Sequence, residues 1–158
     1  MEAVPAHRRA DVLRPVVVLE YDAVGVWTAV DRRSIRPATL RNAGPEPALN
    51  VTISELKLND ESWCAFDPVP VLAPRQVVTI DPVWWRPDPR ETAYRQIPLT
   101  QAISRSVVTQ VLQGRPPVTS WTSRIRYEDP SGARYLAMYR IEVCEFPLRV
   151  HARCVRAL

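Results

Sequence analysis

Proline is the residue type that most constrains how this chain folds. The sequence has 16 prolines and only 4 glycines among 158 residues. A proline inside a helix removes a backbone hydrogen bond and clashes with the preceding turn, and the interior of a sheet excludes it for a similar reason. Because the prolines recur along the whole chain, the sequence predicts many short elements joined by proline-punctuated loops rather than long helices.

Strand patterns recur between these loops. The apolar, β-branched run Val16–Tyr21 predicts a first strand. In Ala48–Leu58, apolar and polar residues alternate with the period of two of a half-buried strand, and a change of parity near Ser54 and Glu55 indicates a bulge or a strand end. Further strands are expected at 24–30, after Pro37 up to residue 42, and at 76–80, 118–127, 134–143 and 148–154.

The middle of the chain is less regular. We expect residues 59–68 to form a loop, and residues 81–98 to form an extended, proline-stiffened connection that carries Trp84 and Trp85. A helix follows, because apolar residues recur at a spacing near 3.6 after Pro98 and the pattern stops at Gly114. The sequence therefore predicts one helix, at about 99–113, among many strands.

This pattern predicts an all-β protein, an Ig-like two-sheet antiparallel β-sandwich with one inserted α-helix. A fold of alternating strands and helices would need several helices, which the pattern does not supply. The length suits one domain. We expect a flexible N-terminal arm at 1–13 and a single domain at 14–158, with 81–114 as an insertion.

Three stretches resemble bacterial Ig-like domains, including the cell-adhesion-related CARDB type. Leu40–Val51 (LRNAGPEPALNV) resembles their N-x-G-x-x-P-A-x-N-V signature. Val71–Gln76 is similar to their L-x-P-G-E/Q turn, with Arg75 in place of the usual glycine, and Tyr127–Tyr135 resembles their Y-x-D-x-x-G hairpin. The resemblance implies an Ig-like sandwich, a bacterial source and a display, spacer or adhesion role, and it brings no catalytic residues.

No residue pattern typical of a catalytic, metal or cofactor site is present. The chain lacks a G-x-S-x-G elbow, a P-loop and a G-x-G-x-x-G motif, and its two histidines are His7 and His151. The spacing of Cys144, His151 and Cys154 matches no zinc finger or ribbon, and residues 59–61 lack the alternating oxygen ligands of a calcium loop. We therefore expect no enzyme, no metal and no cofactor, and free thiols in a reducing compartment.

The charge permits, but does not require, an anionic partner. The net charge is +4, nearly all from arginine. No stretch reaches the ~20 apolar residues of a membrane span, and the apolar run after the N-terminus is too short for a signal peptide. We expect a cytoplasmic location as written, or a periplasmic or cell-envelope one if a membrane anchor was removed. Two arginine clusters stand out: Arg32, Arg33 and Arg36, and Arg149, Arg153 and Arg156.

The 81–114 insertion carries the main functional hypothesis. A tryptophan pair beside an amphipathic helix suits an anchor for another protein, although the helix could equally cover an open sheet edge. We therefore expect a non-catalytic protein–protein interaction or assembly module that binds another protein or itself. The alternative is nucleic-acid or anionic-surface binding through the arginine clusters. The candidate binding residues are Trp84, Trp85, Arg86, Arg149 and Arg153.

Overall fold

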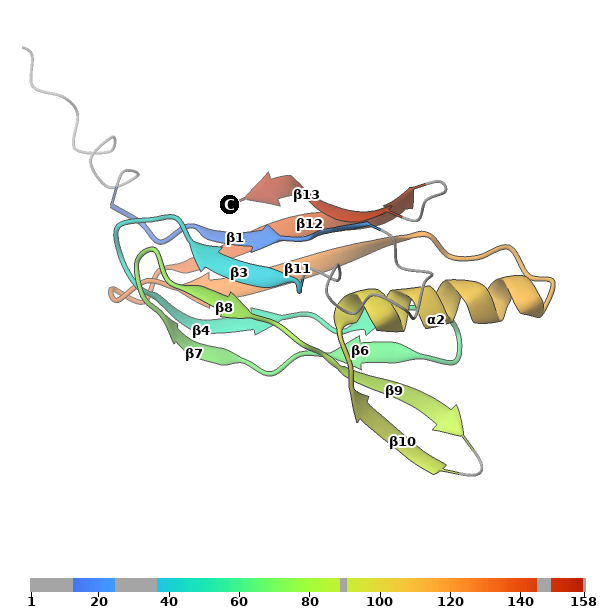
Figure 1. The fold of residues 1–158 in the computed structure, drawn as a ribbon. Helices are drawn as coiled ribbons and strands as arrows, with labels where there is room; N and C mark the ends of the chain where they lie inside the picture. The colour runs from blue at the N-terminus through green and yellow to red at the C-terminus, as the bar shows by residue number, and fades with distance from the viewer. Residues whose placement is uncertain (1–12, 25–36, 89–90, 145–148, 158) are drawn as a thin grey trace, which may run out of the picture.

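The computed structural model describes residues 13–24, 37–88, 91–144 and 149–157, and for 22–24, 86–88, 91–96, 144, 149–153 and 155–157 it describes the backbone only. This part of the chain is all-β with one helix, as predicted (Figure 1). The expected strand at 24–30 lies almost wholly outside the described residues. Two sheets were expected, whereas the strands of the described part form three antiparallel sheets.

The largest sheet has six strands, and its centre is the long hairpin of β11 and β12. Every second residue of β11 from Trp121 to Tyr127 is buried, so this strand presents one face to the core. In sheet order the strands are β2 (Asp22–Val24), β13 (Arg149–Ala157), β12 (Arg134–Cys144), β11 (Ser120–Glu128), β4 (Ala48–Ile53) and β7 (Val69–Leu72).

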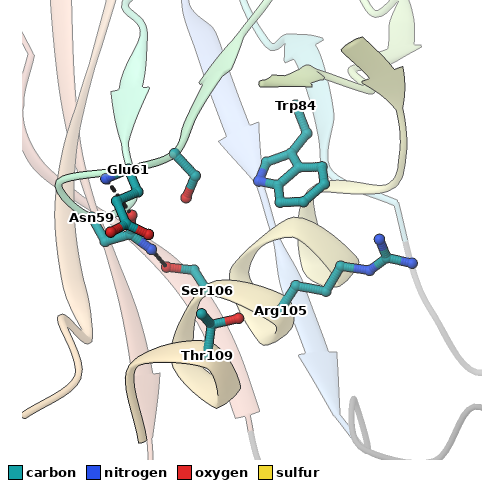
Figure 2. A pocket seen from close by; sticks show the side chains of 7 residues that line it. Asn59, Glu61, Trp84, Arg105, Ser106 and Thr109 are labelled. Atoms are coloured by element: carbon teal, nitrogen blue, oxygen red, sulfur yellow. Dashed lines mark hydrogen bonds between the residues drawn. The ribbon is translucent and has the colours of Figure 1, made fainter. Parts of the chain in front are cut away.

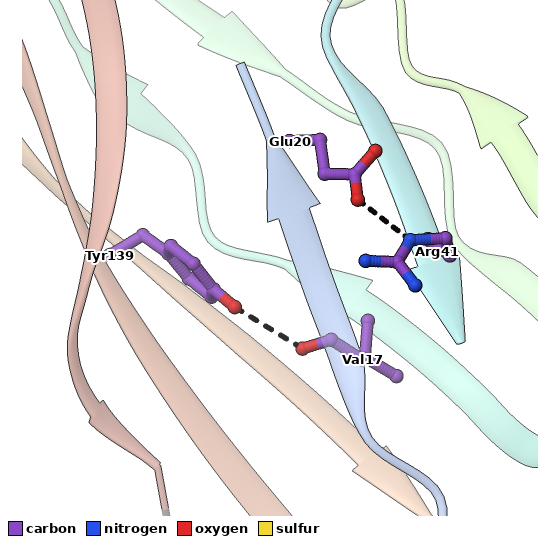
Figure 3. Close-up of polar contacts among 4 residues, drawn as sticks. All are labelled: Val17, Glu20, Arg41 and Tyr139. Carbon is purple, nitrogen blue, oxygen red and sulfur yellow. Dashed lines mark hydrogen bonds and ion pairs between the residues drawn. The ribbon is translucent and has the colours of Figure 1, made fainter. Parts of the chain in front are cut away.

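A three-stranded sheet packs over this one and makes the sandwich. It consists of β1 (Val17–Glu20), β3 (Thr39–Asn42) and β8 (Val77–Thr79). The Tyr139 hydroxyl of β12 donates a hydrogen bond of 3.4 Å to the carbonyl oxygen of Val17, which joins the two layers (Figure 3). Within the three-stranded sheet, Arg41 of β3 and Glu20 of β1 form an exposed ion pair at 2.6 Å (Figure 3).

The third sheet corrects two expectations. Its strands are β5 (Leu56–Lys57), β6 (Trp63–Ala65), β9 (Val83–Asp88) and β10 (Glu91–Gln96), in the order β10-β9-β6-β5. The expected loop at 59–68 therefore contains a strand, and the expected connection at 81–98 is a hairpin. Pro87 is tolerated because it lies beyond Trp85, the last residue of β9 that pairs with β6, where one edge of the strand is open.

The predicted helix is confirmed as α2 (Leu99–Leu112), preceded by Pro98. It ends as expected at Gly114, whose φ of 68° is left-handed. The amide groups of Gly114 and Arg115 donate to the carbonyl groups of Val111 and Gln110, a Schellman ending. Figure 1 shows α2 at the end of the sandwich that also carries the β9–β10 hairpin.

At the opposite end of the sandwich, the Asn42 side chain joins three segments of the chain. It is fully buried. Its Oδ1 accepts hydrogen bonds from the amides of Val16 (3.2 Å) and Gly44 (3.0 Å), and its Nδ2 donates to the carbonyls of Glu46 (2.7 Å) and Leu72 (3.0 Å). Gly44 is required there, because a Cβ would lie 2.3 Å from the carbonyl oxygen of Arg14.

Among the described residues, two non-glycine residues adopt left-handed backbone conformations. Arg75 has a φ of 65° in the turn between β7 and β8. Asn50 has a φ of 50°, and there β4 carries one residue more than β11, which makes a bulge. The predicted strand end near Ser54 is also confirmed, because β4 stops at Ile53 and β5 starts at Leu56.

Candidate functional site

The four-stranded sheet has one buried and one partly exposed face. Neighbouring residues of a strand point to opposite faces, and β6 pairs with β9 so that Trp63 is opposite Trp85 and Cys64 is opposite Trp84. Cys64 and Trp84 are buried in the core. Trp63 and Trp85 are half-buried and belong to the other face.

Trp63 and Trp85 form an aromatic pair on this outer face. Their ring centroids are 3.7 Å apart, with an angle of 32° between the ring planes. Lys57, whose side chain is exposed, is opposite Trp63 on β5, and Tyr94 holds the register position opposite Trp85 on β10. The backbone register of the sheet thus aligns one residue from each of its four strands in a single row.

The structure separates the candidate residues that the sequence grouped together. Trp84 is only 6% exposed, and the Arg105 guanidinium lies 5.7 Å from the centre of its ring. Arg86 follows on β9, and its side chain lies outside the described residues, as do those of Arg149 and Arg153 on β13. Of the candidate residues, Trp85 is the one that the structure places in a partly exposed aromatic pair.

Trp63 is the residue that sequence reasoning missed. The sequence predicts a loop around Trp63, because β6 has three residues and its partner β5 has two. Strands this short cannot show a clear alternation of apolar and polar residues. The sequence shows only that a bulky aromatic residue, Trp63, precedes a small apolar residue, Cys64. These neighbours indicate a strand with two different faces only once their pairing with β9 is known.

The buried face of this sheet meets α2 at a small polar hollow. Its water-accessible volume is about 10 Å³, and it is lined by Asn59, Glu61, Ser62, Trp84, Arg105, Ser106 and Thr109 (Figure 2). Asn59 Nδ2 donates to Ser106 Oγ at 2.8 Å, and Asn59 Oδ1 accepts the Glu61 amide at 2.7 Å. Trp84 Nε1 and Ser62 Oγ are both buried without a hydrogen-bond partner.

Burial and hydrogen bonding suppress the chemistry of Cys64, Tyr21 and Ser104, which are all buried. Burial, followed by the nearby Glu55 charge, raises the pKa of Cys64 to about 12, so its thiol stays protonated and is a poor nucleophile or metal ligand. Burial also raises the pKa of Tyr21, whose hydroxyl shares a hydrogen bond of 2.6 Å with Thr100 on α2. Ser104 is occupied too, because its hydroxyl donates to the Thr100 carbonyl at 2.9 Å.

A second surface with functional potential is the outer face of the six-stranded sheet. Arg124 and Arg126 are exposed on β11, and neither forms an ion pair with another described residue. Arg134 and Arg140 on β12 are partly neutralised, since they lie 3.3 Å from Glu128 and 3.6 Å from Glu142. The sequence pattern points to other arginines, and these alternating residues are not among the predicted candidates.

Within the described residues, no group of three His, Cys, Asp or Glu residues could hold a metal ion, and no helix has the length and apolar character to cross a bilayer. Asp129 shapes the turn between β11 and β12, because its Oδ1 accepts the amides of Ser131 (2.9 Å) and Ala133 (3.0 Å). Comparison of the chain with protein-family models, curated proteins and solved structures gave no match.

Proposed function

We propose that this protein is a non-catalytic interaction module that binds another protein chain, or a second copy of itself, through the outer face of the four-stranded sheet. The observation that carries the proposal is the aromatic pair, Trp63 and Trp85, half-exposed on a face whose other side is packed into the core. A sheet of a folded domain needs only one buried face. Two large aromatic side chains on the other face are therefore available for contact with a partner.

The energetics of this face favour a protein partner. Tryptophan is enriched among the residues that dominate binding energy, since it buries a large apolar area. Trp63 and Trp85 already pack against each other, so little side-chain freedom is lost when a partner covers them. Exposed Lys57 at the end of the row supplies a polar rim. Because the two rings face each other, they are poorly placed to stack on nucleobases.

We also propose that the chain is a bacterial Ig-like domain. Support comes from the roles of the signature residues: buried Asn42 bonds to three segments, and Gly44 leaves room for the backbone of Arg14. The left-handed conformation of Arg75 explains why similar domains carry glycine there. The display, spacer or adhesion role implied by this resemblance agrees with binding through a sheet face.

The test compares two double variants in partner capture and in self-association. Trp63→Thr/Trp85→Thr removes the aromatic pair, and Val71→Thr/Val77→Thr is the control, since it removes exposed apolar groups from another surface. We expect the native protein and the control to retain a protein partner, or to self-associate, at low and high salt, and the tryptophan variant to lose it. Retention by the tryptophan variant at both salt concentrations contradicts the proposal.

A second candidate function is binding to nucleic acid or another anionic surface through Arg124 and Arg126. It is favoured by their exposure on one face of β11 without an ion pair in the described part of the chain. Contacts with phosphates weaken steeply with salt, whereas an aromatic interface responds little. Binding that disappears at high salt and in Arg124→Gln/Arg126→Gln, but persists in the tryptophan variant, supports this second function.

A further inference from the structure

The hollow beside α2 contains two buried hydrogen-bonding groups that lack a partner. Trp84 is 6% exposed and Ser62 is 3% exposed, and neither Trp84 Nε1 nor Ser62 Oγ is bonded. Buried polar groups in folded proteins nearly always have a partner, and an exception calls for a missing ligand or water. Two exceptions in the lining of one hollow indicate a shared missing partner.

Both of these groups call for an acceptor. The indole N–H of Trp84 can only donate, and the Ser62 hydroxyl can donate as well. Ser106 Oγ, which also lines the hollow, already accepts from Asn59 (2.8 Å) and from Gln110 (3.2 Å). Figure 2 shows the indole nitrogen of Trp84 on the side of its ring that faces the Asn59–Glu61 loop and α2, toward the space that the lining residues enclose.

Size and charge define the acceptor further. A water-accessible volume of about 10 Å³ admits roughly one oxygen-sized atom. Arg105 is exposed, lines the hollow and lies over the Trp84 ring, so a positive charge stands beside the bound atom. Glu61 is exposed and lines the hollow as well, and its carboxylate repels a doubly charged anion such as phosphate or sulfate about twice as strongly as it repels a singly charged one.

We propose that this hollow binds a carboxylate, one oxygen of which accepts hydrogen bonds from Trp84 Nε1 and Ser62 Oγ while Arg105 balances the charge. The same chemistry is offered by a small free carboxylic acid and by an acidic side chain of a bound protein. This site is separate from the outer aromatic pair, since Trp84 and Trp85 belong to opposite faces of β9.

The test follows the indole N–H resonance of Trp84 by NMR on protein labelled with ¹⁵N-tryptophan. The chain has five tryptophans, and loss of one signal in Trp84→Phe assigns the resonance. The native protein is titrated with acetate at constant ionic strength and, as the control, with neutral acetamide. We expect a saturable shift of the Trp84 signal with acetate alone.

Variants of the lining test the role of each group. Ser62→Ala should weaken acetate binding roughly tenfold or more, because it removes a hydrogen bond to a charged oxygen. Arg105→Gln should weaken it about two- to fivefold, as befits an exposed charge. Trp63→Phe on the outer face is the matched control and should leave acetate binding unchanged, whether or not it affects partner capture. An unchanged acetate affinity in both lining variants overturns the assignment.

A titration with a capped glutamate shows whether the carboxylate comes from an acidic side chain of a protein or from a small free acid. The corresponding capped glutamine is the neutral control. A shift with both acetate and capped glutamate supports an acidic side chain of a protein, and a shift with acetate alone supports a small free acid. A Trp84 signal that stays constant throughout both titrations and exchanges magnetisation with a bound water means that water fills the hollow, and it overturns the proposal.

Discussion

At the end of the sandwich that holds Asn42, a fully buried amide uses both of its polar atoms in hydrogen bonds, whereas at the end that holds α2, Trp84 Nε1 and Ser62 Oγ are buried without partners. The Asn42 end places its Gly44 where a Cβ would clash with backbone. The α2 end instead leaves a hollow about 10 Å³ in volume beside the helix.

The difference separates residues that hold the fold together from residues that are available for binding. A satisfied, close-packed polar cluster stabilises and fixes one arrangement of the chain. Buried donors without a partner lower the stability of the isolated domain. Such donors are more readily kept in a protein where a ligand accepts their hydrogen bonds. The half-exposed Trp63 and Trp85 belong to the same end, so both proposals of binding fall on the α2 side of the molecule (Figure 1).

The largest effect is expected from Asn42→Ala. It removes four hydrogen bonds and leaves the amides of Val16 and Gly44 and the carbonyls of Glu46 and Leu72 without their partner. We expect a loss of roughly 3–5 kcal/mol in the free energy of unfolding. Urea unfolding measures it, and a loss below about 1 kcal/mol would show that this end is not the stabilising one.

The next prediction compares the same substitution at two buried tryptophans. Trp121 Nε1 donates to the Leu58 carbonyl at 3.2 Å, whereas Trp84 Nε1 has no partner. Trp121→Phe and Trp84→Phe remove the same atoms. The difference between their losses in the free energy of unfolding therefore isolates the contribution of the hydrogen bond. We expect Trp121→Phe to be more destabilising by about 1–2 kcal/mol in urea unfolding. Equal losses would mean that Trp84 Nε1 is bonded in the isolated protein.

A smaller effect of opposite sign is expected at the turn between β7 and β8. Arg75 adopts a left-handed φ of 65°, which strains a residue that has a Cβ. Arg75→Gly should therefore raise the free energy of unfolding by about 0.5–1 kcal/mol, after the greater flexibility of glycine in the unfolded chain is counted. Thermal unfolding, with Arg75→Ala as the control that keeps the strain, measures the gain. A lower unfolding temperature for the glycine variant would contradict it.

The smallest effect concerns pH at the β11–β12 hairpin. Hydrogen bonds from Ser131 first, and then from Tyr135, lower the pKa of Asp129 below its usual 3.8. A lowered folded-state pKa contributes stability above the unfolded pKa, and this contribution is lost as the pH falls through the folded one. Native protein should therefore exceed Asp129→Asn in stability at neutral pH, by a margin that narrows at strongly acidic pH. A margin independent of pH would exclude the carboxylate as its source.

The sequence predicted the parts of this fold that depend on local pattern. The helix that starts after Pro98 and stops at Gly114 and the strand end near Ser54 each follow from residues close together in the chain. The third sheet could not be predicted in this way, since β5 and β6 are two and three residues long and gain their partners through pairing over long distances. The aromatic pair and the hollow depend on the same pairing.

The central claim is that the α2 end of the molecule binds a partner and the Asn42 end stabilises the fold. Hydrogen exchange tests this claim most directly. The exchange of backbone amides is compared for the protein alone and for the protein saturated with its captured partner or at self-associating concentration. The account predicts slower exchange in residues 55–65, 83–88 and 91–96 upon binding, with no change around Asn42 and Arg75. Protection centred on the Asn42 turn and β8, with the four-stranded sheet unchanged, would contradict it.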